Sequence, residues 1–566
     1  MHKENKPEAL DLLVNTSWEV CNKIGGIYAV LSTQAASINQ IYGDRAIYVG
    51  PDVWRLGGVE SPYFTEDANA LKNWPGRESL PYGVSVRIGR WSVPGRPIAI
   101  LVDFTPMYAV KDEFYGRMWQ LYGVDSLHAY GDYDEACAFS HAAGIVVESL
   151  FDFFNSPINK KSEATINAAA HFHEWTTGMG LLYIKDKRPD IATLFTTHAT
   201  SIGRSICGNG KPLYDYLKGY NGDQMARELN MESKHSLEKA AAHQADCFTT
   251  VSDITAAECE QLLERRPDIV TPNGFEKGFV PSKKHFAAAR QQARKKLSEV
   301  ASALTGNQYS DDVFFIATSG RCEYRNKGID MYLDVMATLR AHTDELDRNV
   351  VAFVMVPAWV DKAREDLSNA LEAANRTSTL PDPVITHTVN NPFDDPILGR
   401  LHALGFDHAD PRLAVIYVPC YLDGRDGIFN GMSYYDLLIG MDATVFPSYY
   451  EPWGYTPLES IAFGVPTVTT SLSGFGQWVL TSSEATFENS GVNVAARCDN
   501  NYSATVDSIC RSLRFLIDAD APLSNAISNA AIATSDRAAW SFFISYYEQA
   551  YAIAERNRDK RAGRKI

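Results

Sequence analysis

The sequence predicts an α/β protein built from two doubly wound domains, and two observations support this class. Short apolar runs alternate along the whole chain with segments of helical character. Continuous apolar runs flanked by helices are typical of parallel strands that are covered on both faces. The 566 residues, 45% of them hydrophobic, are also too many for a single core, so we expect two domains with a cleft between them.

The predicted strands recur in both halves of the chain. They are residues 12–14, 46–49, 98–102, 168–172, 193–196 and 247–251 in the first half, and 313–317, 350–356, 413–418, 443–446 and 467–470 in the second. A Thr-Pro-Asn-Gly turn signal at 271–274, followed by a Lys/Arg-rich helix around 284–300, marks the boundary. We therefore predict Rossmann-like domains over residues 1–275 and 276–539.

The C-terminal stretch from residue 540 to about residue 558 predicts one amphipathic helix. Its apolar residues at roughly helical spacing are Phe542, Ile544, Tyr547, Ala550 and Ile553. We expect residues 540–566 to complete the N-terminal domain.

Composition narrows the function classes. A formal net charge of -16 disfavours nucleic acid and acidic membranes as partners. The nine cysteines include no Cys-x-x-Cys pair, so a zinc knuckle or a disulfide framework is not indicated and a reducing compartment is expected. The polar N-terminus contains no secretory h-region, and no apolar run approaches membrane-spanning length, so we expect a cytoplasmic protein.

The most informative motif is Tyr-Tyr-Glu-Pro-Trp-Gly-Tyr-Thr-Pro-Leu-Glu at residues 449–459. It joins a predicted strand to a helix. Glu451 stands at the strand end, Gly454, Tyr455 and Thr456 form the turn, and Glu459 lies in the first helical turns. Two carboxylates and free backbone N–H groups at such a junction can hold an anionic leaving group and a polyol.

In each half of the chain, the loop after the first predicted strand is a second candidate site. Lys23, Gly25 and Gly26 open a helix, where glycine N–H groups and the helix dipole can meet a phosphate. Arg321 and Lys327 lie in the other loop, where two cations suit a diphosphate leaving group. Taken alone, the Gly25–Gly26 loop is better explained as a tight turn, and the Arg321–Lys327 loop is at least as well explained as a solvated run of charges.

Residues 171–175 and 195–204 begin at strand ends and contain three histidines and Glu174. The histidines lack the i, i+4 pairing of a hydrolytic zinc site, so we predict no metal. Hydrogen bonds from His and Glu to sugar hydroxyls fit better, because neutral sugars need polar partners in a partly apolar site. For His171, a satisfied place in the core is expected.

Several blocks of the sequence, in order and spanning nearly the whole chain, resemble the glycogen synthases of the animal and fungal type. The blocks are residues 22–28, 171–175, 195–204, 249–256, 266–274, 326–328, 449–459 and 472–476.

This resemblance implies a retaining GT-B glucosyltransferase that moves glucose from a nucleotide-diphosphate glucose to the 4-hydroxyl of a growing α-1,4-glucan. UDP-glucose is the implied donor, with ADP-glucose as the alternative, and no cofactor is implied. The implied catalytic residues are Glu451, His198, Arg321 and Lys327, and the implied acceptor contact is Glu174. The implied nucleotide-sugar contacts are Lys23, Gly25, Gly26, Arg204, Tyr434 (stacked on the base), Gly454, Tyr455, Thr456 and Glu459.

Several alternatives stay open at this point. Retention allows either two displacements through a covalent glucosyl-carboxylate or a same-face exchange. A different retaining GT-B transferase of the sucrose- or trehalose-synthase type is the main rival, and a non-catalytic glycan-binding scaffold is the rival from another class. Association into a homo-oligomer is also open.

The sequence departs from the animal and fungal pattern in three places. The first predicted strand begins near the start of the sequence, so we expect no N-terminal phosphorylation arm of the animal type. The segment 357–381, where the family carries oligomerising helices, is short. The arginine cluster that binds glucose 6-phosphate in the family is reduced here to Arg511 and Arg514, followed by the acidic Asp518 and Asp520.

Glucose 6-phosphate is therefore expected to activate this protein little or not at all. Two arginines supply fewer charge-assisted hydrogen bonds to a phosphate than a dense cluster does. Initial rates across millimolar glucose 6-phosphate at subsaturating donor test this. A several-fold rise that disappears in an Arg511→Ala/Arg514→Ala double variant would show that the allosteric site is present.

Overall fold

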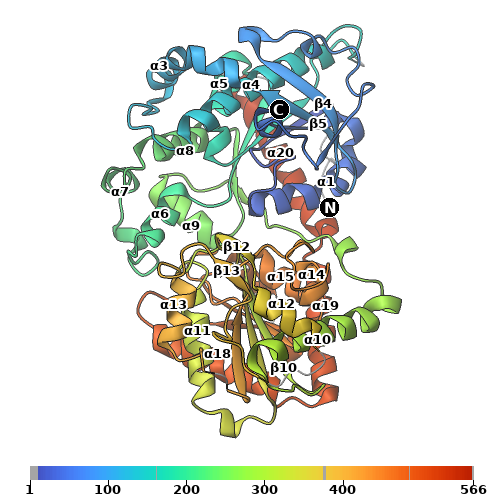
Figure 1. Ribbon diagram of the computed structural model, residues 1–566. Helices are drawn as coiled ribbons and strands as arrows, with labels where there is room; N and C mark the ends of the chain where they lie inside the picture. The colour runs from blue at the N-terminus through green and yellow to red at the C-terminus, as the bar shows by residue number, and fades with distance from the viewer. Residues whose placement is uncertain (1–9, 161, 374–377, 409, 483–484, 564–566) are drawn as a thin grey trace, which may run out of the picture. The chain divides into compact units, whose positions relative to one another are not determined.

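The structure is a computed structural model that describes residues 10–160, 162–373, 378–408, 410–482 and 485–563 (Figure 1). The chain divides into two compact units. The first comprises the residues up to Gly274 together with those from Trp540 on, and the second comprises Phe275–Ala539.

The first unit contains a nine-stranded sheet of order β3-β4-β5-β2-β1-β6-β7-β8-β9. Its strands are β1 (Leu12–Thr16), β2 (Ala46–Pro51), β3 (Phe64–Glu66), β4 (Ser85–Trp91), β5 (Ile98–Asp103), β6 (Ala168–His173), β7 (Ala192–Thr197), β8 (Cys247–Thr250) and β9 (Ile269–Val270). All neighbours pair in parallel except β3-β4 and β4-β5, which are antiparallel. The strand order reverses between β1 and β6, which makes this the switch point where ligands of doubly wound sheets bind.

Helices cover both faces of this sheet. They are α1 (Gly26–Tyr42), α2 (Val53–Leu56), α3 (Lys111–Tyr122), α4 (Tyr133–Phe154), α5 (Gly178–Lys187), α6 (Ser201–Gly208), α7 (Gly222–Glu228), α8 (Glu232–Gln244), α9 (Asp253–Leu262) and α20 (Trp540–Arg561). Alternate strand residues face opposite ways: Ile47 and Val49 join the core around α4, whereas Tyr48 joins a second core with Leu31 of α1.

Helix α4 is long and apolar enough, by length and composition alone, to cross a membrane, with a mean hydropathy of 1.3 over its most apolar window. This run was not recognised from the sequence as one of membrane-spanning length. In the structure 72% of that window is buried, and Phe139, Val146 and Phe151 are fully enclosed. Its apolar character is accounted for by its place as the central core helix of the first unit.

The second unit contains an all-parallel six-stranded sheet of order β14-β11-β10-β15-β16-β17. Its strands are β10 (Phe314–Ser319), β11 (Val350–Met355), β14 (Leu413–Tyr417), β15 (Ala443–Val445), β16 (Thr467–Thr470) and β17 (Val492–Ala495), and a separate antiparallel pair is formed by β12 (Val360–Ala363) and β13 (His387–Val389). Counted along the main sheet, the order is that of the Rossmann fold, with its switch point between β10 and β15.

The helices of the second unit flank this sheet. They are α10 (Lys283–Thr305), α11 (Ile329–Arg340), α12 (Glu365–Glu372), α13 (Pro396–Ala403), α14 (Tyr434–Leu438), α15 (Tyr455–Ala462), α16 (Gly474–Ser482), α17 (Phe487–Ser490), α18 (Tyr502–Ile517) and α19 (Ala521–Arg537). The core between the sheet and helices α11 and α18 contains Ile316, Val350 and Leu513. The segment 357–381 carries β12 and α12, and its residues 374–377 lie outside the described part.

The predicted α/β class with parallel sheets is confirmed, and each predicted run forms a strand. Strands β3, β4, β9, β12, β13 and β17 were not predicted. Strand β4 contains Ser85, Arg87 and Arg90, and its positions 85–87 and 90 are exposed or only partly buried, so this antiparallel strand does not present the continuous apolar run that identified the others.

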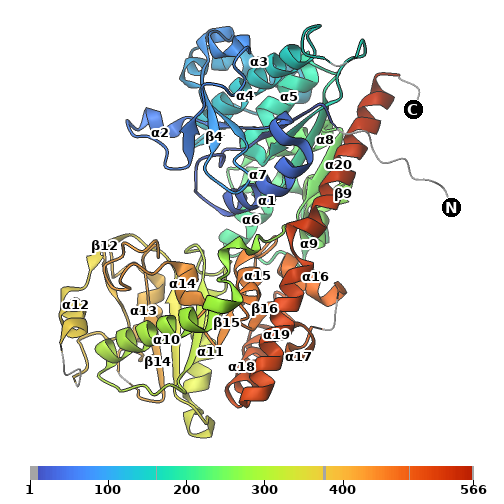
Figure 2. The ribbon, with the colours of Figure 1, turned by 90° about the vertical axis from the view of Figure 1, so that its right-hand side faces the viewer.

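The C-terminal helix was predicted with one error. Helix α20, at the red end of the chain in Figure 2, packs along β7 and β8 in the first unit. Phe542, which the sequence analysis placed on its apolar face, is 61% exposed. Ile544, Tyr547 and Ala550 are buried as predicted, and Phe543 and Tyr551 are buried on the same face.

Trp540 packs the start of this helix against the rest of the first unit. It is 2% exposed, and its indole N–H donates to Thr33 Oγ1 of α1 at 2.8 Å. A Cβ at Gly274 would lie 2.7 Å from the Trp540 ring, so glycine is required for the two segments to pack this closely.

Trp540→Ala is expected to destabilise the protein by about 3–5 kcal/mol, through loss of buried area and of the bond to Thr33. Phe542→Ala, two residues further along the helix, is the control and should cost less than about 0.5 kcal/mol, since the ring is exposed. Urea unfolding followed by fluorescence and circular dichroism measures both. Equal effects of the two variants would contradict this account of how α20 packs.

Candidate functional site

The candidate site of the second unit lies at the switch point of its sheet. Arg321 and Lys327 belong to the loop that joins β10 to α11, and Glu451 belongs to the loop that joins β15 to α15. Because β10 and β15 are parallel neighbours, both loops leave the same edge of the sheet.

Lys327 and Glu451 are in direct contact. The Lys327 ammonium lies 2.5 Å from Glu451 Oε2, and the side chains are 20% and 12% exposed. The Ser448 hydroxyl donates to the same carboxylate oxygen at 3.4 Å. Two residues 124 positions apart in the chain thus form one ion pair at the sheet edge.

Backbone hydrogen bonds fix this arrangement. The amides of Tyr449 and Tyr450 donate to the Asn326 carbonyl at 2.8 and 3.0 Å. On the other side, the Gly474 amide donates to the Glu451 carbonyl at 3.0 Å. The backbone around Glu451 is therefore held both by the Lys327 loop and by the start of α16.

Two glycines allow the loops to come this close. Gly328 has φ +69°, and a Cβ there would lie 1.9 Å from the Pro447 carbonyl oxygen. Gly454 has φ +114° and stands directly before α15. Any other residue would be strained at both positions and would also displace Pro447 at the first.

Arg497 is a site residue that the sequence analysis missed. It is 6% exposed, follows β17, and donates to the same Pro447 carbonyl. Its guanidinium and that of Arg325 lie 5.4 and 5.2 Å from the Tyr449 ring centroid. A lone arginine after an unpredicted strand gave no sequence signal.

The other predicted residues of this unit lie around the same edge. Arg321 is about half exposed and pairs with Glu323 at 2.8 Å. The Tyr434 hydroxyl and Ser319 Oγ are 2.8 Å apart, and the Tyr435 hydroxyl donates to Glu459 Oε1 at 2.7 Å. Gly454, Tyr455 and Thr456 form the cap and first residues of α15. The segment thus places a helix N-terminus and a carboxylate beside the Lys327–Glu451 pair, which suits a phosphate and a polyol.

In the first unit, the loop after β1 is closed by a carboxylate. Glu19 Oε2 accepts from the Gly25 and Tyr28 amides at 2.7 and 2.8 Å. Lys23 is exposed, with its ammonium 5.9 Å from the Tyr28 ring centroid. The Gly25 amide, expected from the sequence to be available for a phosphate, is engaged by Glu19 in this structure.

Histidines cluster at the ends of β6 and β7. His173 Nδ1 and His198 Nε2 are 3.1 Å apart, and His171 Nε2 bonds to Thr196 Oγ1 at 2.7 Å. Burial lowers the pKa of both His171 and His198 to about 3, so both rings are neutral at pH 7. His171 has the expected place of a satisfied core histidine, and His198 acts as a hydrogen-bonding group rather than a cation.

Glu174 lies beside His198 and holds its backbone. Its Oε1 accepts from the amides of His198 and Ala199 at 2.9 and 3.0 Å, and its own φ is +71°. Burial and the charge of Glu238 raise the pKa of Glu174 to about 8, against the opposing effect of Arg204.

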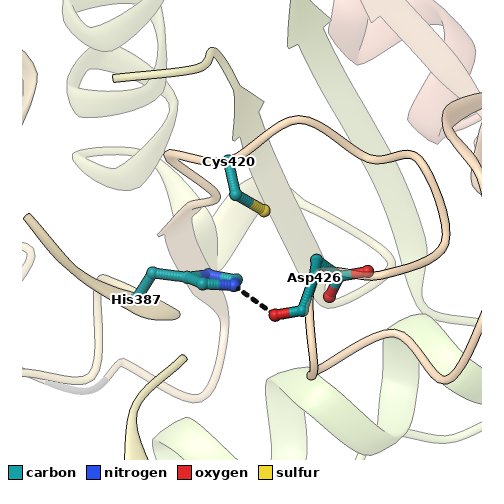
Figure 3. A group of neighbouring side chains, drawn as sticks. All are labelled: His387, Cys420 and Asp426. Carbon is teal, nitrogen blue, oxygen red and sulfur yellow. Dashed lines mark hydrogen bonds between the residues drawn. The ribbon is translucent and has the colours of Figure 1, made fainter. Parts of the chain in front are cut away.

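His387, Cys420 and Asp426 of the second unit lie close enough to hold a metal ion, with ligand atoms within 4.8 Å of one another (Figure 3). However, His387 Nε2 bonds to the Asp426 backbone carbonyl at 2.9 Å, and Nδ1 to Thr386 Oγ1 at 2.8 Å. A carbonyl only accepts, so Nε2 carries the proton and Nδ1 accepts from the Thr386 hydroxyl. The Asp426 carboxylate points away from the ring. The contact holds the loop after β14 rather than forming a metal centre.

The pair Arg511 and Arg514 lies on α18. Arg514 pairs with Glu345, so part of this already sparse positive charge is neutralised within the protein.

The chain is similar in sequence to known proteins over most of its length. A family model described as "Glycogen synthase" matches residues 15–373 and 364–558. The chain is 30% identical to the glycogen [starch] synthase of Neurospora crassa over 91% of its length and 80% of that protein, and 31% identical to isoform 1 of Saccharomyces cerevisiae over 83% and 75%. It is 29% identical to the human liver glycogen [starch] synthase, over 82% of its length and 72% of that protein.

Solved structures resemble the fold. The catalytic domain of starch synthase IV from Arabidopsis thaliana has a TM-score of 0.58 at 13% identity, covering 97% of this chain and all of that one. A sucrose-phosphate synthase from Thermosynechococcus elongatus has a TM-score of 0.52 at 13% identity, with 96% and 98% covered.

The raised pKa of Glu174 predicts a pH-dependent stability. Between its ordinary pKa of about 4.5 and its folded value of about 8, the folded protein keeps a proton that the unfolded chain has released. Stability from this group is therefore present at low pH and is lost as the pH rises through this window. In Glu174→Gln, whose amide oxygen can still accept both N–H groups, that loss should be reduced.

The melting temperature of Glu174→Gln relative to wild type should thus rise by roughly 2–5 °C between pH 5 and pH 8.5. Differential scanning fluorimetry measures this, with the exposed Glu78→Gln as control. Parallel pH curves for wild type and Glu174→Gln would refute the assigned titration.

Proposed function

Because the chain belongs to the glycogen synthase family, we propose that it transfers glucose from UDP-glucose to the non-reducing end of an α-1,4-glucan with retention at the anomeric carbon. The protein is a glycosyltransferase of the GT-B fold with glycogen synthase activity, since the family match and the curated relatives span most of the chain. The choice of nucleotide and the stereochemical course are our proposals.

The observation that carries the proposal is the Lys327–Glu451 ion pair at the Rossmann switch point. Departure of a nucleoside diphosphate builds negative charge on its phosphates and positive charge on the glucosyl carbon. Lys327, with Arg321 nearby in sequence, would neutralise the first, and the Glu451 carboxylate would stabilise the second. The Lys327 ammonium and the Glu451 carboxylate, 2.5 Å apart, would thus each face one of the two charges that develop as the bond breaks.

The surrounding groups fit the remainder of a nucleotide sugar. The amides at the start of α15, from Gly454, Tyr455 and Thr456, would face phosphate oxygens, since a helix N-terminus favours anions. Glu459, whose Oε1 accepts from the Tyr435 hydroxyl, would contact the ribose hydroxyls. Tyr434 would stack on the base.

The first unit would supply neutral polar groups. His198, uncharged at pH 7, would hydrogen-bond a hydroxyl of the transferring glucose. Glu174 would contact the acceptor glucan, and Lys23, Gly26 and Arg204 would contact the donor, whereas the Gly25 amide is held by Glu19. A same-face exchange needs no further base, because the leaving phosphate itself can accept the proton of the acceptor hydroxyl.

The rival functions are less well supported. Neighbours named for sucrose-phosphate or trehalose-phosphate synthesis share 11–13% identity, which supports the fold alone. The glycogen synthase relatives share about 30% identity. A non-catalytic scaffold would have no need to keep Lys327 and Glu451 in contact inside a partly buried site.

Purified protein incubated with glycogen is expected to release nucleotide and extend the polymer with UDP-glucose faster than with ADP-glucose, and to do neither appreciably without a primer. Glu451→Ala should lower the transfer rate by at least ~100-fold while the circular dichroism spectrum is unchanged. Glu488→Ala, an exposed glutamate in the same unit, is the control and should leave the rate unchanged.

Near-wild-type turnover in Glu451→Ala would remove the assignment of this residue. Faster transfer from ADP-glucose would correct the proposed donor without affecting the assignment of the site.

A further inference from the structure

The loop that carries His198 is hydrogen-bonded to three glutamate side chains from three different parts of the first unit. Glu174 follows β6, Glu238 lies on α8 and Glu258 lies on α9. Neither Glu238 nor Glu258 was predicted from the sequence to be a site residue, since isolated glutamates on helices usually face solvent. In the structure they are 0% and 1% exposed.

Each of five successive residues, 197–201, is bonded to one of these carboxylates. Glu238 Oε1 accepts from the Thr197 hydroxyl at 3.0 Å, and its Oε2 accepts from the Ser201 amide and hydroxyl at 2.9 and 2.6 Å. Glu258 Oε2 accepts from the Thr200 hydroxyl at 2.7 Å. The amides of His198 and Ala199 donate to Glu174, as described above.

Glu258 packs closely against the start of α6. The Thr200 hydroxyl both donates to Glu258 and accepts from the Gly203 amide at 3.2 Å, so it caps α6 in one fixed orientation. A Cβ at Gly203 would lie 2.6 Å from Glu258 Oε2 and 2.3 Å from Thr200 Oγ1. The glycine therefore allows the buried carboxylate to reach the loop.

Burying carboxylates is expensive unless each is well hydrogen-bonded, and a short loop can be held by neutral groups instead. Burial also raises the pKa of Glu238, in line with the enclosed setting. Three acids converging on one loop therefore indicate that its exact geometry matters. The loop carries the His198 ring, whose Nε2 lies 3.1 Å from His173 Nδ1.

We propose that Glu238 and Glu258, together with Glu174, are positioning residues that fix the loop 197–201 and thereby place the His198 imidazole for glucosyl transfer. The inference rests on the proposed function, in which His198 contacts the transferring sugar. Glu238 and Glu258 touch no substrate and act only through the loop. Misplacing a hydrogen-bonding group by about 1 Å can cost on the order of 100-fold in rate.

A double-mutant cycle between Glu238 and His198 tests this. Glu238→Gln keeps the side-chain shape but replaces one accepting oxygen by an NH2 group, which cannot accept from Ser201 or Thr197. It should lower kcat by roughly 10-fold with little change in KM for UDP-glucose, as expected for an interaction felt mainly in the transition state. In a His198→Ala background the same change should lower kcat by less than about 2-fold.

The control is Glu260→Gln, an exposed glutamate on α9, which should change nothing. Equal losses from Glu238→Gln in both backgrounds would overturn the inference, because the residue would then not act through His198. Wild-type kcat in His198→Ala would overturn it as well. Failure of the wild-type protein to transfer glucose from either donor would overturn the proposed function itself, and the inference with it.

If Glu238→Gln does not fold, Ser201→Ala provides the same test without altering a buried charge. It removes one of the bonds to Glu238 and should lower kcat by roughly 3-fold, again only when His198 is present. An unchanged kcat in this variant would overturn the inference.

Discussion

The candidate site of the second unit depends on how closely two loops approach each other at the middle of the sheet. Gly328 lies against the Pro447 carbonyl with no space for a Cβ. The Asn326 carbonyl accepts from the amides of Tyr449 and Tyr450. This contact fixes where Lys327 and Glu451 lie, because each is one to three residues from the packed backbone. The buried guanidinium of Arg497 donates to the Pro447 carbonyl. The ion pair is thus a consequence of backbone packing rather than of attraction between two mobile side chains.

The two units share the strand order at the switch point but differ in the charge of the side chains placed there. Both sheets reverse their strand order at the middle, and both place polar residues there. In the second unit the edge carries formal charges of both signs. In the first unit burial keeps the histidines neutral and favours the protonated form of Glu174. Charged groups suit a diphosphate, and neutral ones suit sugar hydroxyls.

Much of this could be predicted from sequence, because it depends on local pattern. Continuous apolar runs identified the buried parallel strands, and Glu451 stood out within an unusual strand-to-helix motif. The partly exposed, arginine-containing strand β4 and the short β17 lacked that signal. Glu19, Glu238 and Glu258 were missed for a different reason: a carboxylate that binds backbone amides or hydroxyls of a distant segment looks, in the sequence, like any solvated charge. Only the tertiary structure reveals its partner.

The division of the first unit has a consequence for how the protein is made. Trp540 bonds to Thr33 across 507 residues of chain, and α20 packs on strands formed from the first half. During synthesis, at about 5–20 residues per second, the whole second unit must emerge before α20 does, a delay on the order of tens of seconds. Until then the face of β7 and β8 that α20 covers remains uncovered on the nascent chain. The second unit is continuous in sequence, so all of its residues are available before those of α20. The second unit can therefore complete its fold before the first unit, although the first unit begins the chain.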